Sequence, residues 1–242
     1  SWKWWEHLTP AAREAFLDYN PVGTADADGR LYRSVRWGRH AEFFILDTRS
    51  YRDGNGERDD GDKSLLGAAQ KAWLLEALSA SNATWKVIVS SVPISIPTGD
   101  EAIGRDGWAD YDSGLGFERE LTEILRAVQG LTKRQVLFLT TDVHFGAVFR
   151  YVPFADDPDF VFHEIVAGPI NAGVFPRAEI DPTFGPERLY RHGPERAGDI
   201  TSYEDAQRWF NFGVVEIDEA GSLKARLVTA AGETAYELSL RP

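Results

Sequence analysis

The sequence predicts an α/β fold, in which strands of a sheet alternate along the chain with helices that cover it. Between residues 42 and 142, three apolar runs typical of buried strands alternate with two helical segments. After residue 150, short strands separated by turn residues indicate antiparallel β-structure. With 43% hydrophobic and 12% aromatic residues, the 242-residue chain has ample material for a core, and we expect one domain over residues 1–242.

Three helices are expected. Thr9 suits a helix N-cap and Pro10 suits the first helical position, so the first helix should begin there and continue to Tyr19. Amphipathic patterns predict two more helices, over residues 64–81 and 117–130. The apolar positions expected near one face of the second helix are Ala72, Leu75, Ala77 and Leu78.

Strands are expected where apolar or alternating runs are bounded by turn residues. In chain order these runs cover residues 30–37, 41–48, 84–94, 133–146, 159–168, 209–218, 222–229 and 233–240. The loop-rich segments are 54–64, 97–116 and 171–205. A loop as long as residues 97–116 inside a compact domain is usually functional or disordered.

Polar residues follow each of the three strands that alternate with helices. They are Asp47, Thr48 and Arg49 after the first strand, Ser90 and Ser91 after the second, and Asp142 and His144 after the third. Ligands of open α/β sheets bind at the carboxyl ends of the strands. The sequence therefore predicts a functional site where these ends meet.

Asp142 and His144 are candidate metal ligands. If the strand continues that far, two residues with a spacing of two point to the same side. A carboxylate and an imidazole on one face suit Mn, Fe, Zn or Ca centres. The alternative interpretation is a capping aspartate beside a histidine that is hydrogen-bonded within the fold.

Arg49 and Ser91 are candidates for contact with a substrate. For Arg49 the alternative is a structural ion pair or turn with Asp47, and Ser90 and Ser91 are more typical of strand-end caps than of catalysis. A serine nucleophile would also need a strained elbow such as G-x-S-x-G, which the sequence does not contain.

The overall charge argues against two classes of partner. A formal net charge of −12 disfavours binding to nucleic acid or to an anionic membrane through bulk electrostatics. No apolar run approaches the roughly 20 residues that span a bilayer. Cysteine is absent, which excludes thiolate metal sites and a cysteine nucleophile. An anionic substrate would need a local cationic site, made by metal ions or converging arginines.

Several blocks of the sequence are long and specific: LYRSVRWGRHAEFFILDTRSYRD, LLGAAQKAWLLEALSASNATWKVIVSSVPI, RDGWADY with GFERELTEIL, VLFLTTDVHFG and FHEIVAGPINAG. Together, from about residue 9 to the C-terminus, they resemble the alkaline phosphatase D (PhoD-like) family of metallophosphoesterases. The resemblance implies a calcineurin-like sandwich of two mixed sheets flanked by helices. It also implies metal-dependent hydrolysis of phosphate mono- and diesters, from small molecules or polymers.

The resemblance implies roles for individual residues. TTDVH matches the last metal motif of the family, so Asp142 and His144 carry over as catalytic residues and metal ligands, with Thr141 in place of the usual glycine. Iron and calcium are the implied ions, with manganese or zinc as alternatives. Arg49 and Ser91 then lie where substrate phosphate would bind. The resemblance suggests an extracytoplasmic location, while the sequence itself leaves the compartment open.

The earlier metal motifs of the family are not found in this chain, which also begins without Met. We therefore expect a piece of a longer product that lacks N-terminal strands and has impaired activity. Two alternatives remain open. One is a non-catalytic α/β scaffold or partner-binding domain, and the other is an enzyme whose N-terminal fragment is retained non-covalently.

Overall fold

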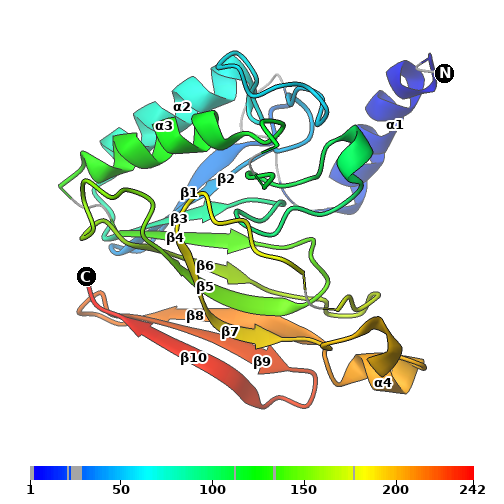
Figure 1. Cartoon of the computed structure of the whole chain (residues 1–242). Helices are drawn as coiled ribbons and strands as arrows, with labels where there is room; N and C mark the ends of the chain where they lie inside the picture. The colour runs from blue at the N-terminus through cyan, green and yellow to red at the C-terminus, as the bar shows by residue number, and fades with distance from the viewer. Residues whose placement is uncertain (1–2, 21, 23–28, 112, 133–134, 177) are drawn as a thin grey trace. The chain divides into compact units, whose positions relative to one another are not determined.

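The computed structural model describes the chain except residues 1–2, 21, 23–28, 112, 133–134 and 177, and except the side chains of residues 1–7. The chain divides into two compact units, residues 1–33 and 34–242. The first contains α1 (Lys3–Tyr19), drawn in dark blue in Figure 1. Pro10 lies inside this helix, so the prediction that the helix begins there is wrong. A proline costs a helix interior one hydrogen bond, and the good helix formers after Pro10, such as Ala11 and Ala12, favour its continuation.

The second unit is built on a seven-stranded mixed sheet with the strand order β1-β2-β3-β4-β6-β5-β7. Its strands are β1 (Arg33–Trp37), β2 (Ala41–Ile45), β3 (Trp85–Val89), β4 (Gln135–Thr140), β5 (Gly146–Tyr151), β6 (Phe162–Val166) and β7 (Pro186–His192). Strands β2, β3, β4 and β6 are parallel neighbours, whereas β5 runs antiparallel to β6 and β7. The α/β class is confirmed, and the parallel neighbours at the centre of the sheet are consistent with the alternation of strands and helices.

Helices α2 (Gly67–Ala80) and α3 (Glu118–Gln129) lie together on one face of this sheet (Figure 1). The fully buried residues of α2 are Gln70, Leu74 and Leu78, spaced by four. Of the predicted positions, Leu78 is buried, Leu75 and Ala77 are partly buried and pack against the core, and Ala72 is exposed, so the prediction is wrong only for Ala72 and missed Gln70 and Leu74. Gln70 is buried because its side-chain amide pairs with the backbone N–H and C=O of Asp47. This pairing ties α2 to the carboxyl end of β2.

The opposite face of the large sheet packs against a second, three-stranded sheet (Figure 1). Its strands are β8 (Asn211–Ile217), β9 (Leu223–Thr229) and β10 (Thr234–Leu240), in the order β10-β9-β8. Trp85, Val87 and Leu137 of the large sheet share a buried cluster with Leu223 and Leu227 of the small one. The C-terminal strands are antiparallel as predicted, so this sheet is antiparallel and not mixed.

Other elements complete the second unit. They are α4 (Tyr203–Gln207) and the short 3₁₀ helices η1 (Glu101–Ile103) and η2 (Ala197–Asp199). The patterns did not predict β5 or β7. Among the described residues, no helix has the length and apolarity that crossing a bilayer would demand.

Candidate active site

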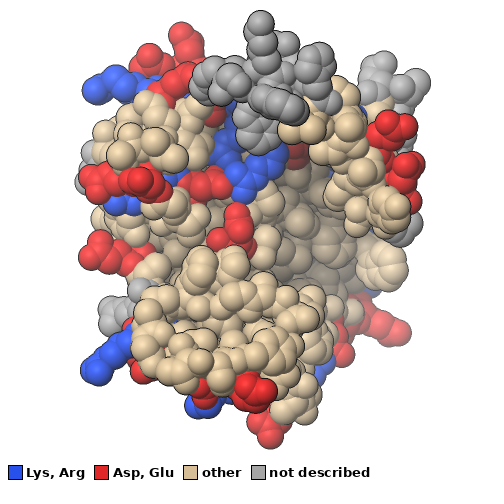
Figure 2. All heavy atoms as spheres, turned by 90° about the vertical axis from the view of Figure 1, so that its right-hand side faces the viewer, with Lys and Arg blue, Asp and Glu red and all other residues tan. Residues whose placement is uncertain are grey.

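The carboxyl ends of β2, β3, β4 and β6 lie next to one another because these strands are parallel neighbours. Figure 2 looks onto this side of the molecule and shows basic and acidic atoms side by side near its centre, beside a hollow. The segments that follow the four strands therefore meet at one edge of the sheet, as the sequence predicted.

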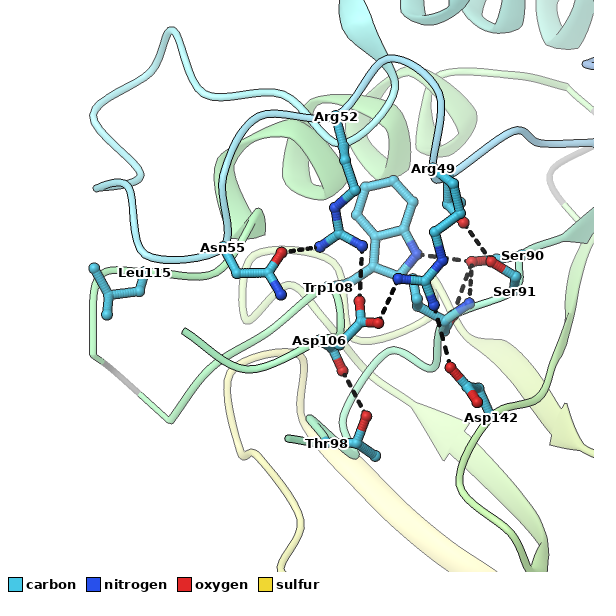
Figure 3. A network of polar contacts seen from close by, with 12 residues as sticks. Arg49, Arg52, Asn55, Ser90, Ser91, Thr98, Asp106, Trp108, Leu115 and Asp142 are labelled. Carbon is cyan, nitrogen blue, oxygen red and sulfur yellow. Dashed lines mark hydrogen bonds and ion pairs between the residues drawn. The ribbon is translucent and has the colours of Figure 1, made fainter. Parts of the chain in front are cut away.

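Arg49, which follows β2, is the centre of the polar network at this edge (Figure 3). Its Nη2 lies 3.2 Å from Asp142 Oδ2, and its Nη1 lies 2.5 Å from Asp106 Oδ2. The Arg49 side chain is nevertheless 50% exposed. The guanidinium therefore bridges two carboxylates and is still accessible to solvent. An arginine that binds an anionic ligand needs such access.

Asp106 lies in the long loop 97–116 and links two arginines. Its Oδ1 accepts a hydrogen bond from Arg52 Nη1 at 2.8 Å, while Oδ2 pairs with Arg49. Burial by itself would raise the pKa of Asp106, but the hydrogen bonds and charges of Arg52 and Arg49 outweigh it and hold the pKa below its usual value. Asp106 is thus charged, and its segment is fixed by paired backbone hydrogen bonds with Thr98.

The two serines after β3 have different surroundings (Figure 3). Ser90 is buried: its Oγ donates to Val92 O at 2.8 Å and accepts from Trp108 Nε1 at 3.2 Å. Ser91 is partly exposed, and its Oγ contacts the hydroxyl of Thr48. Ser90 is therefore a structural residue, whereas Ser91 lies at the surface of the site.

Asp142 and His144 do not lie on a strand. β4 ends at Thr140, and residues 141–145 form a bend, so the argument from strand alternation fails for them. Both residues have left-handed backbones, with φ of 72° and 61°. Such a conformation costs a non-glycine residue about 1 kcal/mol. The bend turns the chain directly into β5, which explains why the continuous apolar pattern was not one strand.

The imidazole of His144 is held in place from two sides. Its Nδ1 lies 2.6 Å from Gly173 O, and its ring stacks on Phe175 with a centroid distance of 4.2 Å. Because a carbonyl oxygen only accepts, Nδ1 carries the proton in this hydrogen bond. The lone pair of the neutral ring is then on Nε2, which is the arrangement found in histidines that bind metals.

Asp142 and His144 line a cavity of about 390 Å³ at the end of β4. Thr141 and residues 167–172, which follow β6, complete its lining. The Asp142 side chain is 44% exposed. The Asp142 carboxylate and the His144 imidazole thus form one accessible wall of the cavity, and Arg49 is paired with the Asp142 carboxylate.

The two carboxylate oxygens of Asp47 have different surroundings. Its Oδ1 accepts hydrogen bonds from the backbone N–H groups of Arg49 and Ser50, which shapes the turn after β2. Its Oδ2 is buried and has no hydrogen-bond partner within the described part of the chain. Of the structural alternative for Asp47 and Arg49, an ion pair or a turn, the structure shows the turn, with Asp47 Oδ1 accepting from the backbone N–H of Arg49.

The donor set suits a metal ion only in part. A carboxylate and an imidazole have the right chemistry, but the described residues hold no group of three or more His, Asp or Glu side chains placed to bind one ion. Sequence reasoning did not select Asp106, Gly173 or Phe175. Only the length of the loop 97–116 pointed toward Asp106, and no pattern marked the residues that hold His144.

The comparison with known families decides the assignment, because a family model described as PhoD-like phosphatase matches residues 2–227. This chain belongs to the PhoD-like phosphatase family. Alkaline phosphatase D of Bacillus subtilis (strain 168) is 27% identical to it over 148 residues, which are 55% of this chain and 25% of that protein.

A solved structure of PhoD superposes on this PhoD-like chain with a TM-score of 0.51 and 25% identity, over 67% of this chain and 34% of the other. The chain therefore spans well under two thirds of the length of either relative. The family inferred from the sequence blocks is confirmed.

Proposed function

We propose that this protein hydrolyses phosphate mono- and diesters with the help of bound metal ions, at the edge where Arg49, Asp142 and His144 meet. One observation carries the proposal: the Arg49 guanidinium, anchored by Asp106, lies 3.2 Å from the carboxylate of the Asp142-His144 bend in a PhoD-like phosphatase. The two packed sheets support the finer assignment to a calcineurin-like sandwich.

In this proposal Asp142 and His144 are catalytic residues that hold a metal ion through a carboxylate oxygen and Nε2. Iron and calcium are the proposed ions, with manganese or zinc as alternatives. A bound cation supplies Lewis acidity, which offsets the charge of the phosphate and activates water. Because the described residues place no third ligand with these two, we expect residues 1–242 alone to bind metal weakly and to turn over slowly.

Arg49 and Ser91 are the proposed contacts to the substrate phosphate. A guanidinium matches phosphate oxygens with two parallel N–H donors. In the present structure the donors of Arg49 face Asp142 and Asp106. If Asp142 held a cation, Nη2 of Arg49 would be free to donate to an anion, while Asp106 would keep the arginine in place. The Ser91 hydroxyl, at the surface of the same edge, would donate to a phosphate oxygen.

Two further proposals concern the protein as a whole. A non-covalently retained N-terminal fragment would supply more ligands, and intact mass spectrometry of purified material would reveal it. An extracytoplasmic location is proposed from the family resemblance. The rival function, a non-catalytic α/β scaffold, is not favoured by the match to a phosphatase family.

The test combines metal content with hydrolysis. Purified protein is loaded with iron and calcium, and its metal content and its hydrolysis of bis(p-nitrophenyl) phosphate are measured before and after treatment with EDTA. We expect hydrolysis to require metal. Asp142→Asn and His144→Ala should lower both the bound metal and the rate.

The matched control is Asp156→Asn. Asp156 is also an exposed aspartate paired with an arginine, Arg126, but it lies away from the strand ends. This variant should keep its metal and its rate. Full metal content in both Asp142→Asn and His144→Ala would remove these residues from the metal site, and hydrolysis unaffected by EDTA would contradict metal dependence.

A further inference from the structure

The cavity beside Asp142 and His144 has a second wall, which is apolar. Residues 167–172 form this wall, named here the β6 wall because it follows β6. Four of its six residues are apolar: Ala167, Pro169, Ile170 and Ala172. Ile170 is 75% exposed. A single exposed isoleucine is ordinary on a protein surface, but this one lines the same cavity as a carboxylate and an imidazole.

The β6 wall is held from below by a buried side chain. Asn211, at the start of β8, is 1% exposed. Its Oδ1 accepts from Gly168 N at 3.0 Å, and its Nδ2 donates to Gly168 O at 2.9 Å. The backbone N–H of Asn211 also donates to Pro169 O at 2.8 Å. These three hydrogen bonds fix the wall at the residues just before Ile170.

Contacts beyond Ile170 fix the other side of the wall. The hydroxyl of Tyr203 donates to Asn171 Oδ1 at 3.1 Å, and Gly173 O is the partner of His144 Nδ1. Phe175 N donates to His144 O at 3.1 Å. The wall and the imidazole are therefore one preformed unit, and a ligand that binds there has little ordering cost to overcome.

We propose that the β6 wall contacts the organic group of the substrate, so that the site favours phosphoesters with a compact apolar group, such as an aryl ester. This proposal rests on the proposed phosphoesterase function and deepens it. The polar side of the cavity receives the phosphate, and Ile170 with Pro169 receives the apolar group. A volume of about 390 Å³ falls in the range of small-molecule sites and accommodates a phosphate together with one ring.

The arrangement favours an apolar group over a hydroxylated one. Asn171 is the polar side chain of the β6 wall, and its Oδ1 already accepts from Tyr203. A sugar or glycerol group placed on Ile170 would lose water without gaining matched partners there. Ile170 thus determines specificity without taking part in the reaction.

The experiment measures the binding of inorganic phosphate, which has no organic group, and of methylphosphonate and phenylphosphonate, which differ only in the organic group on phosphorus. Protein labelled with ¹³C at the isoleucine methyl groups is titrated with each, in the presence of calcium, and dissociation constants are read from NMR shifts. Phenylphosphonate should bind about tenfold more tightly than methylphosphonate. The Ile170 methyl resonance should shift most with the phenyl compound.

The variant Ile170→Ser should remove most of that tenfold preference while leaving the affinity for inorganic phosphate unchanged. The control is Ile103→Ser, because Ile103 is 71% exposed and does not line the cavity. This variant should keep the wild-type preference.

The outcomes separate the two proposals. If phosphate and methylphosphonate bind but phenylphosphonate binds no better, or if Ile170→Ser keeps the preference, the role of the β6 wall is wrong and the proposed function stands. If none of the three analogues shifts the resonances, both proposals are overturned.

Discussion

Arg49 and Asp142 meet across the carboxyl edge of the sheet, with Nη2 of the arginine 3.2 Å from Oδ2 of the aspartate. They follow β2 and β4, which are separated in the sheet by β3. Arg49 reaches this position because the Asp47 carboxylate shapes the turn before it and Asp106 anchors its other amino group. The ion pair is therefore the product of three segments distant in sequence.

Replacing Arg49 by lysine should weaken the binding of phosphate analogues by about tenfold, because lysine keeps the charge but loses the two-pronged donor. Affinity for phenylphosphonate, measured by NMR titration, checks this. The control is Arg126→Lys, since Arg126 also pairs with a carboxylate, that of Asp156, through two nitrogens 2.9 Å from its oxygens. Equal affinity in Arg49→Lys and the wild type would show that Arg49 does not contact the anion.

Asp106→Asn should act through Arg49. The neutral amide no longer balances Arg49 and Arg52, so Arg49 should lose its fixed orientation and KM for an aryl phosphodiester should rise about fivefold, with a smaller change in kcat. Arg52 is largely buried, so the unfolding free energy should also fall by about 1–3 kcal/mol. Steady-state kinetics and urea unfolding measure the two effects. A loss of stability without any change in KM would make Asp106 structural only.

Glu118, the first residue of α3, should make the protein less stable as the pH rises. Burial of its carboxyl raises the pKa from 4.5 to about 6, although the backbone N–H of Asp110 donates to it and opposes the shift. The contribution is complete below the unfolded value of 4.5 and is lost as the pH rises through about 6. Glu118→Gln, which keeps the acceptor, should be more stable than the wild type at neutral pH by about 1 kcal/mol, after allowance for solvent screening.

Urea unfolding of Glu118→Gln and wild type across this pH range measures the difference. Glu179→Gln serves as a comparison, because Glu179 is an exposed glutamate outside α3. Identical pH slopes for wild type and Glu118→Gln would contradict the prediction.

His163 on β6 should have the opposite effect on stability. Burial, and to a lesser extent the charge of Arg150 across the strand pair, lower its pKa from 6.5 to about 4, against the opposing charge of Glu187. Stability linked to His163 is present above 6.5 and is lost as the pH falls through about 4. The loss should reach about 2 kcal/mol once screening at this partly exposed group is included.

An NMR pH titration of the His163 ring checks its pKa, and His163→Gln should remove this part of the acid destabilisation. His40, a half-exposed histidine at the start of β2, provides the comparison resonance. A His163 ring that titrates near its ordinary value would contradict the prediction.

The sequence was sufficient to predict the alternation of strands and helices, and that the polar residues after three strands lie at one edge of the sheet. Val87, Leu137 and their neighbours form runs long enough to identify strands, and the polar residues that follow each run mark where it ends. Because ligands of α/β sheets bind at the carboxyl ends of the strands, these polar residues can be expected to lie close together even when the contacts between them are not known.

Other features depend on contacts that are invisible in local patterns. In α2, Leu74 and Leu75 are adjacent and equally apolar, yet Leu74 is fully buried and Leu75 only partly so. The pairing of buried Gln70 with Asp47 belongs to the same face as Leu74, and no local pattern indicates it. The bend at Asp142 and His144 separates β4 from β5. It depends on the left-handed backbone of two non-glycine residues, which the amino-acid sequence does not indicate. The strand β5 was missed for this reason.

The hydrogen bonds of Asn211 link the β6 wall to the start of β8, far along the chain from the charged residues of the site. The charged groups at the strand tips come from residues 47–144, whereas the shape of the adjacent apolar surface is set by a residue at the entrance to the small sheet. Under the role proposed for the β6 wall, substitutions in β8 at the contacts of Asn211 would change which ester group fits beside Ile170, while the charged residues after β2 and β4 stay the same.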